Sequence, residues 1–277
     1  MSETPDHGPG RPPRVAVVGH IEWVDFVSLS RYPAEGEVAH ATAWAAGVGG
    51  GGGVAAVVLA ELGAEVDFYL ALGRDAPGKA AVHQLTERGV RPHVAWRDET
   101  TRRAITYLIE GGDRTIVTIG RRLAPAGADE LDWERLREAD GVYFTAGDRA
   151  ALEHARAAGV LTASPRGREA LDGGGPQLDA LIYSQEDADE RAWAERIQDR
   201  ARLLVATDGA RGGRWWGAQE GRWQPVPPPG PPRDSYGCGD SFAAAFTFAL
   251  ARGDSVAQAA RLGAELGARA LSRTGAP

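Results

Sequence analysis

Short apolar runs alternate with longer stretches of helical period along most of the chain. The apolar runs begin at residues 14, 66, 141, 159, 178 and 202, and each ends near a glycine or a polar residue. Short runs of this kind predict buried strands. The stretches of helical period cover residues 53–62, 78–88, 129–139, 148–158 and 187–200. Strands that alternate with helices predict an α/β fold, with a mostly parallel sheet covered by helices on both faces.

Two segments interrupt this alternation. Residues 23–45 and 92–119 contain β-forming residues without a helical period, so we expect them to form a small antiparallel lid over the sheet. Residues 1–13 are polar and rich in proline and glycine, which predicts a disordered tail. The expected organisation is therefore a tail followed by one domain over residues 14–277. Ligands of such sheets bind beyond the carboxyl ends of the strands.

Composition narrows the classes of protein to consider. The 277 residues are 43% hydrophobic and 25% charged, as in an ordinary globular protein. The net charge of −7 argues against nucleic-acid binding, and no apolar run approaches the roughly 20 residues of a membrane span. A single cysteine excludes an intramolecular disulfide, which favours a reducing, cytoplasmic location.

The stretch DSYGCGDSFAAAF, at residues 234–246, carries the strongest chemical signal. Gly237 and Gly239 stand before an Ala/Phe-rich run that predicts a helix. The free N–H groups of a helix start would face this turn and could hold an anion. Asp240 could accept a proton beside it, or it could simply cap the helix. Capping explains the aspartate but leaves the two glycines unexplained. Cys238 as a nucleophile lacks a histidine with a clear claim as its base.

Two further glycine-rich stretches are less specific. GVGGGGGVAAVVLAELG, at residues 47–63, contains the pattern G-x-G-x-x-G and runs directly into an apolar helix. It is compatible with close approach to a small ligand, with a linker, or with a dinucleotide site. VATDGARGG, at residues 205–213, contains T-x-G-x-x-G and could be an ordinary turn between strands. Its short distance before residues 234–240 favours a shared site.

These three motifs, in their order along the chain, resemble those of the ribokinase-like (PfkB) family of carbohydrate and nucleoside kinases. DSYGCGDSF is similar to the C-terminal signature D-[TS]-x-G-A-G-D-x-F, with Cys238 in the alanine place. TDGARGG is similar to the nucleotide-side motif, and residues 50–78 follow the N-terminal signature. The resemblance covers most of residues 14–275. It implies a three-layer sandwich with a mostly parallel central sheet and a β-rich lid, through which members of the family often dimerise.

The resemblance also implies a reaction, the transfer of a phosphoryl group from MgATP to a hydroxyl of a sugar or sugar-like substrate. Asp240 falls at the general base and the backbone of Gly237, Cys238 and Gly239 at the anion hole. Thr207, Gly209 and Gly212 fall on the nucleotide side, and Gly49 and Gly50 align with glycines on the acceptor side. Glu22 and Asp25, near the usual acceptor-binding position, and Arg166 are further candidates for binding the acceptor, and Asp187 is the candidate for Mg²⁺.

The sequence departs from the family pattern at three places. The usual sugar-binding aspartate falls at Val24, between Glu22 and Asp25, and the usual asparagine of the glycine-rich turn falls at Val54. The N-x-x-E motif reads SQED, so that only an acid at Asp187 remains. Ribose or fructose is therefore not transferred from the family as the acceptor.

Several alternatives stay open on the sequence. The chain could be a nucleoside kinase, a ligand-binding member of the family with weakened catalysis, or an NAD-dependent oxidoreductase suggested by the glycine run alone. Arg121, Arg122 and Arg166 lie where lid or strand ends could meet a phosphate, or they are solvated surface arginines. If these arginines bind a phosphate, the acceptor could already be phosphorylated.

Overall fold

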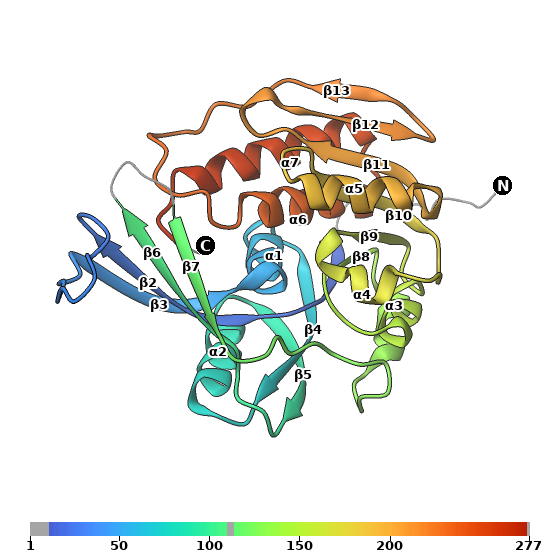
Figure 1. The fold of residues 1–277 in the computed structure, drawn as a ribbon. Coiled ribbons are helices and arrows are strands. Elements are labelled where there is room, and N and C mark those ends of the chain that lie inside the picture. Colours follow the sequence, from blue (N-terminus) through green and yellow to red (C-terminus); the bar gives the residue numbers. More distant parts are fainter. Residues whose placement is uncertain (1–10, 110–113, 276–277) are drawn as a thin grey trace.

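A nine-stranded sheet forms the centre of the molecule in the computed structural model, which describes residues 11–109 and 114–275 (Figure 1). Its strands, in spatial order, are β13 (Gly221–Trp223), β12 (Gly213–Gly217), β11 (Ala201–Thr207), β10 (Leu178–Ser184), β9 (Val160–Ala163), β8 (Gly141–Phe144), β1 (Arg14–Val18), β4 (Glu65–Gly73) and β5 (Val90–Arg97). Neighbouring strands are parallel from β11 to β5, whereas β12 and β13 are antiparallel. The predicted parallel sheet is confirmed.

Helices cover both faces of this sheet and complete three layers. One face carries α1 (Gly50–Glu61), α2 (Ala76–Glu87), α6 (Cys238–Ala251) and α7 (Val256–Leu271). The other carries α3 (Arg149–Ala155), α4 (Arg168–Leu171) and α5 (Ala188–Arg196). Successive side chains of a strand point to opposite faces of the sheet. In β1, Val15 and Val17 face the first helix layer, whereas Ala16 and Val18 face the second. Each buried strand is therefore apolar on both sides, as its sequence indicated.

Four more strands form the lid, which projects from one end of the central sheet (Figure 1). In spatial order they are β3 (Ala43–Gly49), β2 (Glu22–Leu29), β6 (Arg103–Ile109) and β7 (Arg114–Ile119). The two outer pairings are antiparallel, but β2 and β6 are parallel, so the prediction of a purely antiparallel lid was wrong.

The lid boundaries also differ from the prediction. Residues 92–97 belong to β5, which pairs with β4 at the edge of the central sheet. Residues 46–49, expected in the glycine-rich turn, extend the lid strand β3. Alternating apolar residues occur both in a lid strand and in an edge strand, so the pattern could not separate the two.

Side-chain caps fix the start of most helices. Asp75, Asp148 and Asp187 accept hydrogen bonds from the first turns of α2, α3 and α5. Ser255 and Gln258 form a reciprocal capping box at α7. The predicted helix over residues 129–139 is a short 3₁₀ segment, Trp133–Glu138. Helices α1 and α6, like the short α4, begin after a glycine and have no side-chain cap.

The predicted tail lies mostly outside the described residues, which begin at residue 11. Residues 11–13 are held in place: Arg11 forms an ion pair with Asp140 at 2.9 Å, and Glu65 N donates to Pro13 O. None of the helices in the described ranges is both long and apolar enough to span a bilayer.

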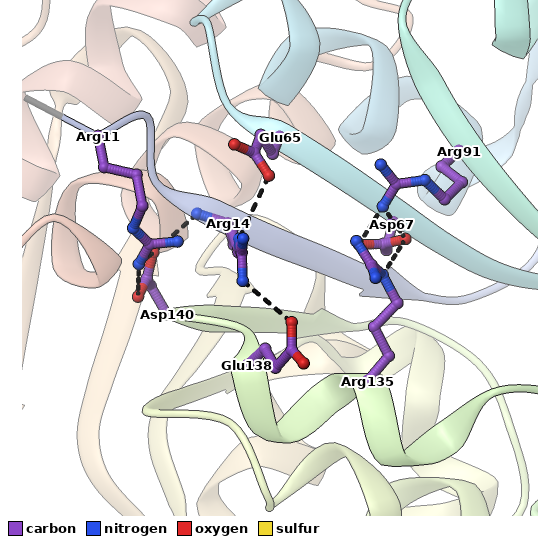
Figure 2. Close-up of polar contacts among 8 residues, drawn as sticks. All are labelled: Arg11, Arg14, Glu65, Asp67, Arg91, Arg135, Glu138 and Asp140. Atoms are coloured by element: carbon purple, nitrogen blue, oxygen red, sulfur yellow. Dashed lines mark hydrogen bonds and ion pairs between the residues drawn. The ribbon is translucent and has the colours of Figure 1, made fainter.

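A network of ion pairs joins the amino ends of β1 and β4 to the segment before β8 (Figure 2). Asp67, on β4, accepts hydrogen bonds from Arg91, His93 and Arg135. Burial acts to raise the pKa of Asp67, but the hydrogen bonds from His93 and Arg135 outweigh it and hold the pKa below its ordinary value. The folded state is therefore stabilised by the ionised form of this carboxyl.

Replacing Asp67 by Asn should lower the free energy of unfolding by about 1–3 kcal/mol at neutral pH, because several charged hydrogen bonds are lost at once. The contribution of a depressed pKa is present above the unfolded value and is lost as the pH falls through the folded value. The difference between wild type and Asp67→Asn should therefore shrink as the pH falls below the ordinary aspartate pKa of 3.8. Urea unfolding at several pH values measures it. An unchanged difference in acid would contradict this account.

Candidate active site

Two helix starts meet at the carboxyl edge of the central sheet. Helices α1 and α6 pack against each other, and both begin beside Asp240. Neither helix is capped by the side chain of its N-cap residue. At α1, the N–H groups of Gly50 and Gly52 donate to Tyr236 Oη and His20 O instead. The positive ends of the two helices face the same region, which favours an anionic ligand there.

The turn before α6 has the geometry that its glycines predicted. Gly237 has φ +73°, in the left-handed region, and a Cβ placed on it would lie 3.0 Å from Val54 Cγ1. Nothing lies within 4 Å of a Cβ placed on Gly239, so the space in front of this residue is open. The helix starts at Cys238, which places Asp240 at the third helical position instead of at the cap. The simple capping interpretation of Asp240 is therefore wrong.

Asp240 is buried, with 7% of its surface exposed, and is held by one arginine. Arg166, in the turn after β9, donates from Nε to Oδ1 at 3.2 Å and from Nη2 to Oδ2 at 3.5 Å. The Asp240 charge raises the pKa of Arg166, which stays a guanidinium at any physiological pH. The Arg166 side chain is 47% exposed, so solvent reaches this pair from the arginine side.

The glycine-rich turn before α1 is shaped by its neighbours inside the protein. A Cβ on Gly49 would lie 2.4 Å from Tyr236 Oη and 2.5 Å from Val24 Cγ2. Gly50 has φ +75° and donates its N–H to Tyr236 Oη at 2.9 Å. Glycine is therefore required at both positions by packing and backbone conformation. One residue further on, a Cβ on Gly51 would lie 2.9 Å from Asp240 Oδ1.

The segment after β1 brings an acid and a histidine to the same region. Glu22 forms an ion pair with Arg102 at 2.9 Å and is 8% exposed. Burial raises the pKa of Glu22, and the charges of Arg102 and other arginines oppose that change. Burial, assisted by three nearby arginines, lowers the pKa of His20 well below its ordinary value, so this histidine is neutral.

Asp25, the second acid expected on the acceptor side, lies elsewhere. Its carboxylate accepts hydrogen bonds from Trp44 Nε1 and Arg103 Nη2 on the lid, at 3.3 and 2.7 Å. Strand residues alternate between faces, so Asp25 lies on the face of β2 opposite to Glu22 and Val24. The structure thus brings Glu22 but not Asp25 to Asp240, and the substrate-binding assignment of Asp25 is not supported by its position.

The T-x-G-x-x-G motif forms the turn that follows β11. Thr207 Oγ1 donates to Tyr183 O, and both Gly209 and Gly212 have positive φ, at +49° and +85°. A Cβ on Gly212 would lie 2.2 Å from Trp223 O, so only glycine fits there. Beside this turn is a recess of about 230 Å³ lined by Gln185, Asp208, Arg211, Arg214, Arg222 and Trp223, among others. Its arginines could receive a phosphate-bearing ligand.

The altered N-x-x-E segment contains a second acid that the motif did not reveal. Asp187 caps α5, accepting from Asp189 N and Glu190 N at 3.0 Å. Glu190 turns back toward the sheet and accepts from Ser184 N at 3.0 Å. Burial raises the pKa of Glu190, and the charge of Arg166 opposes that change. Glu190 stands three residues after the capping aspartate, a capping-box spacing that could have drawn attention to it.

The acids near the altered motif bear on metal binding. Within the ranges that the structure describes, no cluster of three or more His, Cys, Asp or Glu side chains could hold a metal ion. Mg²⁺ commonly binds through one or two carboxylates together with substrate phosphates. The acids Asp187 and Glu190, with the buried and unpartnered Oε1 of Gln185, fit such a shared site.

Cys238 is a poor nucleophile in this setting. Burial raises the pKa of its thiol to about 11, so it is protonated at neutral pH. The backbone of Cys238 belongs to the turn, but its thiol has no apparent chemical role.

The loop that leads into the turn is tied to the end of α7. Asp234 is buried and accepts hydrogen bonds from Tyr236 N at 2.8 Å and from Gly275 N at 2.9 Å. Arg233 N also donates to Leu271 O at 2.7 Å. These contacts fix the loop immediately before Gly237 and explain the first aspartate of the motif.

Comparison with known proteins agrees with this arrangement. The family model described as "pfkB family carbohydrate kinase" matches residues 12–164 and 177–277. No curated protein sequence matches the chain. Similar solved structures include the microbiome-derived acarbose kinase Mak1, with 27% identity, a TM-score of 0.79 and coverage of 96% of this chain and 94% of that one.

Two further structures share the fold at lower identity. Ribokinase from Arabidopsis thaliana, solved with ribose and ATP, is 22% identical with a TM-score of 0.76 and coverage of 96% and 95%. Phosphofructokinase-2 from Escherichia coli is 20% identical with a TM-score of 0.76 and coverage of 95% and 94%. The glycine run, moreover, follows a lid strand instead of a strand of the central sheet, which removes the basis for a dinucleotide site. The chain belongs to the pfkB family of carbohydrate kinases, which transfer a phosphoryl group to an alcohol acceptor.

Proposed function

We propose that this chain transfers the γ-phosphoryl group of MgATP to a hydroxyl of a sugar or sugar-like alcohol. The observation that carries the proposal is the meeting of two uncapped helix starts at one buried carboxylate, Asp240. Donors fixed in advance around a point where negative charge develops are the main requirement of phosphoryl transfer.

Each part of the turn has a role in this reaction. Asp240 accepts the proton of the acceptor hydroxyl, and the backbone of Gly237, Cys238 and Gly239 donates to the phosphoryl oxygens. A bond from the acceptor oxygen to phosphorus forms while the bond to the bridging oxygen breaks, and ADP leaves with that electron pair. Thr207, Gly209 and Gly212 hold the nucleotide at the adjacent recess. Glu22, Gly49, Gly50 and Arg166 face the acceptor.

Mg²⁺, when bound with the nucleotide, neutralises phosphate charge. We assign its organisation to Asp187 and Glu190, with the larger share for Glu190 because Asp187 also caps α5. Glu190→Gln should raise the Mg²⁺ concentration needed for half-maximal turnover at least tenfold, since a carboxylate charge is removed next to the phosphates. Asp187→Asn, which keeps a capping oxygen, should have a smaller effect. Titration of Mg²⁺ at fixed ATP compares the two, and equal effects would contradict the larger share of Glu190.

The identity of the acceptor is tested by ADP release from MgATP across sugars, sugar acids, sugar phosphates, polyols, nucleosides and acarbose. One acceptor that raises ADP release well above the water background supports a kinase and identifies its substrate. Preference for a nucleoside would instead favour the nucleoside-kinase alternative, which a fold neighbour from Methanocaldococcus jannaschii illustrates at 15% identity. No stimulated release, together with normal nucleotide binding, would favour a ligand-binding protein with weakened catalysis.

The lid provides a surface for self-association. Trp44, Val117 and Ile119 lie on the face of the lid that includes Asp25, and they are 66%, 46% and 46% exposed. We propose that two copies pair through this face, since such a row of apolar side chains gains from burial. Light scattering should report a dimer for wild type and a monomer for Trp44→Lys. The single cysteine supports a reducing, cytoplasmic setting for this assembly.

A further inference from the structure

Three arginines surround the acceptor side of Asp240. Arg166 follows β9, Arg122 follows the lid strand β7, and Arg102 precedes the lid strand β6. Their charges act together on His20, which lies against the start of α1 at Gly50. A neutral sugar hydroxyl would require no such concentration of positive charge.

The partners of these arginines differ. Arg102 is neutralised by Glu22 at 2.9 Å. Arg122 donates from Nη2 to two backbone carbonyls, Thr145 O at 3.0 Å and Arg166 O at 2.6 Å. No carboxylate is within ion-pair distance of Arg122 in the described part of the chain, although Glu169 acts on it from further away. Arg122 therefore brings an uncompensated charge to the turn that carries Arg166.

Arg166 is placed where it affects the chemistry directly. Its guanidinium contacts both oxygens of Asp240, and these contacts occupy the carboxylate that the acceptor hydroxyl has to reach. Its partly exposed side chain can still be reached by a ligand beside Asp240. A second anion at this position would compete with Asp240 for the guanidinium.

We propose that the natural acceptor carries an oxyanion group, a carboxylate or a phosphate, which binds Arg166 and Arg122 and draws Arg166 away from Asp240. This inference rests on the proposed kinase function and specifies its substrate class. A neutral acceptor leaves Arg166 on the carboxylate, so both Asp240 oxygens stay engaged by the guanidinium. An anionic acceptor frees Asp240 at the moment when its own hydroxyl is in place.

An alternative position for Arg166 is against the transferred phosphoryl group. The local contacts favour the acceptor, because a Cβ on Gly51 of α1 would lie 3.0 Å from Arg166 Cδ. Arg122, which binds the backbone of Arg166, also comes from the lid side, away from the turn at Thr207. Arg166 bound to the acceptor predicts a larger loss of kcat/KM for anionic acceptors than for neutral ones when it is replaced. Arg166 bound to the transferred phosphoryl group predicts an equal loss for all acceptors.

The experiment compares acceptors in matched sets, namely glycerol with glycerate, glucose with gluconate and glucose 6-phosphate, and fructose with fructose 6-phosphate. ADP release from MgATP is measured for wild type, Arg166→Gln and Arg122→Gln. Arg168→Gln serves as the matched control, because Arg168 is exposed in the same turn and donates to Pro165 O. The carboxylate and phosphate members of each set separate the two sources of the oxyanion.

We expect wild type to prefer an anionic member over its neutral partner by at least 100-fold in kcat/KM. Arg166→Gln should reduce that ratio to below tenfold, because turnover of the anionic acceptor falls much more than turnover of the neutral one. Arg122→Gln should reduce it in part, and Arg168→Gln should keep it.

Equal or better use of neutral acceptors by wild type would overturn the inference while leaving the kinase function intact. Equal loss for both kinds of acceptor in Arg166→Gln, with a higher KM for MgATP, would also overturn it and place Arg166 on the transferred group. Failure of every acceptor would count against the kinase function itself, and the inference would fall with it.

Discussion

Asp240→Asn should reduce phosphoryl transfer by roughly 10²–10⁴-fold, the range expected when a general base is lost. The amide has nearly the shape of the carboxylate but cannot take up the proton of the acceptor hydroxyl. Nucleotide binding should remain close to normal, because the turn at Thr207 and its recess are formed by other elements. Single-turnover ADP formation measures transfer, and the thermal shift produced by a nucleotide analogue measures binding.

The control for this variant is Asp254→Asn at the other end of α6. Asp254 is also an aspartate paired with an arginine, Arg252, but it is remote from the two helix starts. Its replacement should leave transfer unchanged. Turnover of Asp240→Asn close to that of wild type would remove Asp240 from the role of base, whatever the acceptor.

Gly239→Ala should leave the fold intact and still reduce turnover by roughly 10- to 10³-fold. A methyl group on Gly239 meets no atom within 4 Å and lies in a helical turn, so the free energy of unfolding should stay equal or rise by up to about 1 kcal/mol. The same methyl group would occupy the open space where the backbone donors approach the phosphoryl group. Loss of such donors typically costs 10²–10³ in rate.

Gly237→Ala provides the contrast. Its φ of +73° costs an L-residue roughly 1–2 kcal/mol, and its methyl group would press on Val54. This variant should therefore lose both stability and activity, whereas Gly239→Ala should lose activity alone. Denaturant unfolding and steady-state kinetics on the same preparations separate the two. Full activity of Gly239→Ala would show that the phosphoryl group lies elsewhere.

Much of the fold could be predicted because the strands of the central sheet are apolar on both sides. Val15 to Val18 illustrate this, since two cores need all four residues. The lid was harder to predict, because its strands and β5 share the same alternation of apolar and polar residues. Which strands pair is decided by contacts between segments far apart in sequence, such as the parallel pairing of β2 with β6.

The site was predictable where a motif fixes backbone shape, and less so where it depends on side-chain direction. Gly237 and Gly212 have the positive φ that their motifs imply. Asp25 was assigned to the acceptor because it is adjacent to the expected place, yet one step along a strand reverses the face. Glu190 was missed because a helical turn, invisible in the linear motif, brings it back to the sheet.

The hydrogen bond from Gly275 N to Asp234 has a practical consequence for work with this protein. A fusion partner or affinity tag after Gly275 would disturb its contact with Asp234, which helps to position the turn before α6. Kinetic constants measured on carboxyl-tagged protein would then also reflect displacement of the loop. A tag on the amino-terminal side, before Arg11, avoids that loop and is the better choice for the assays described above.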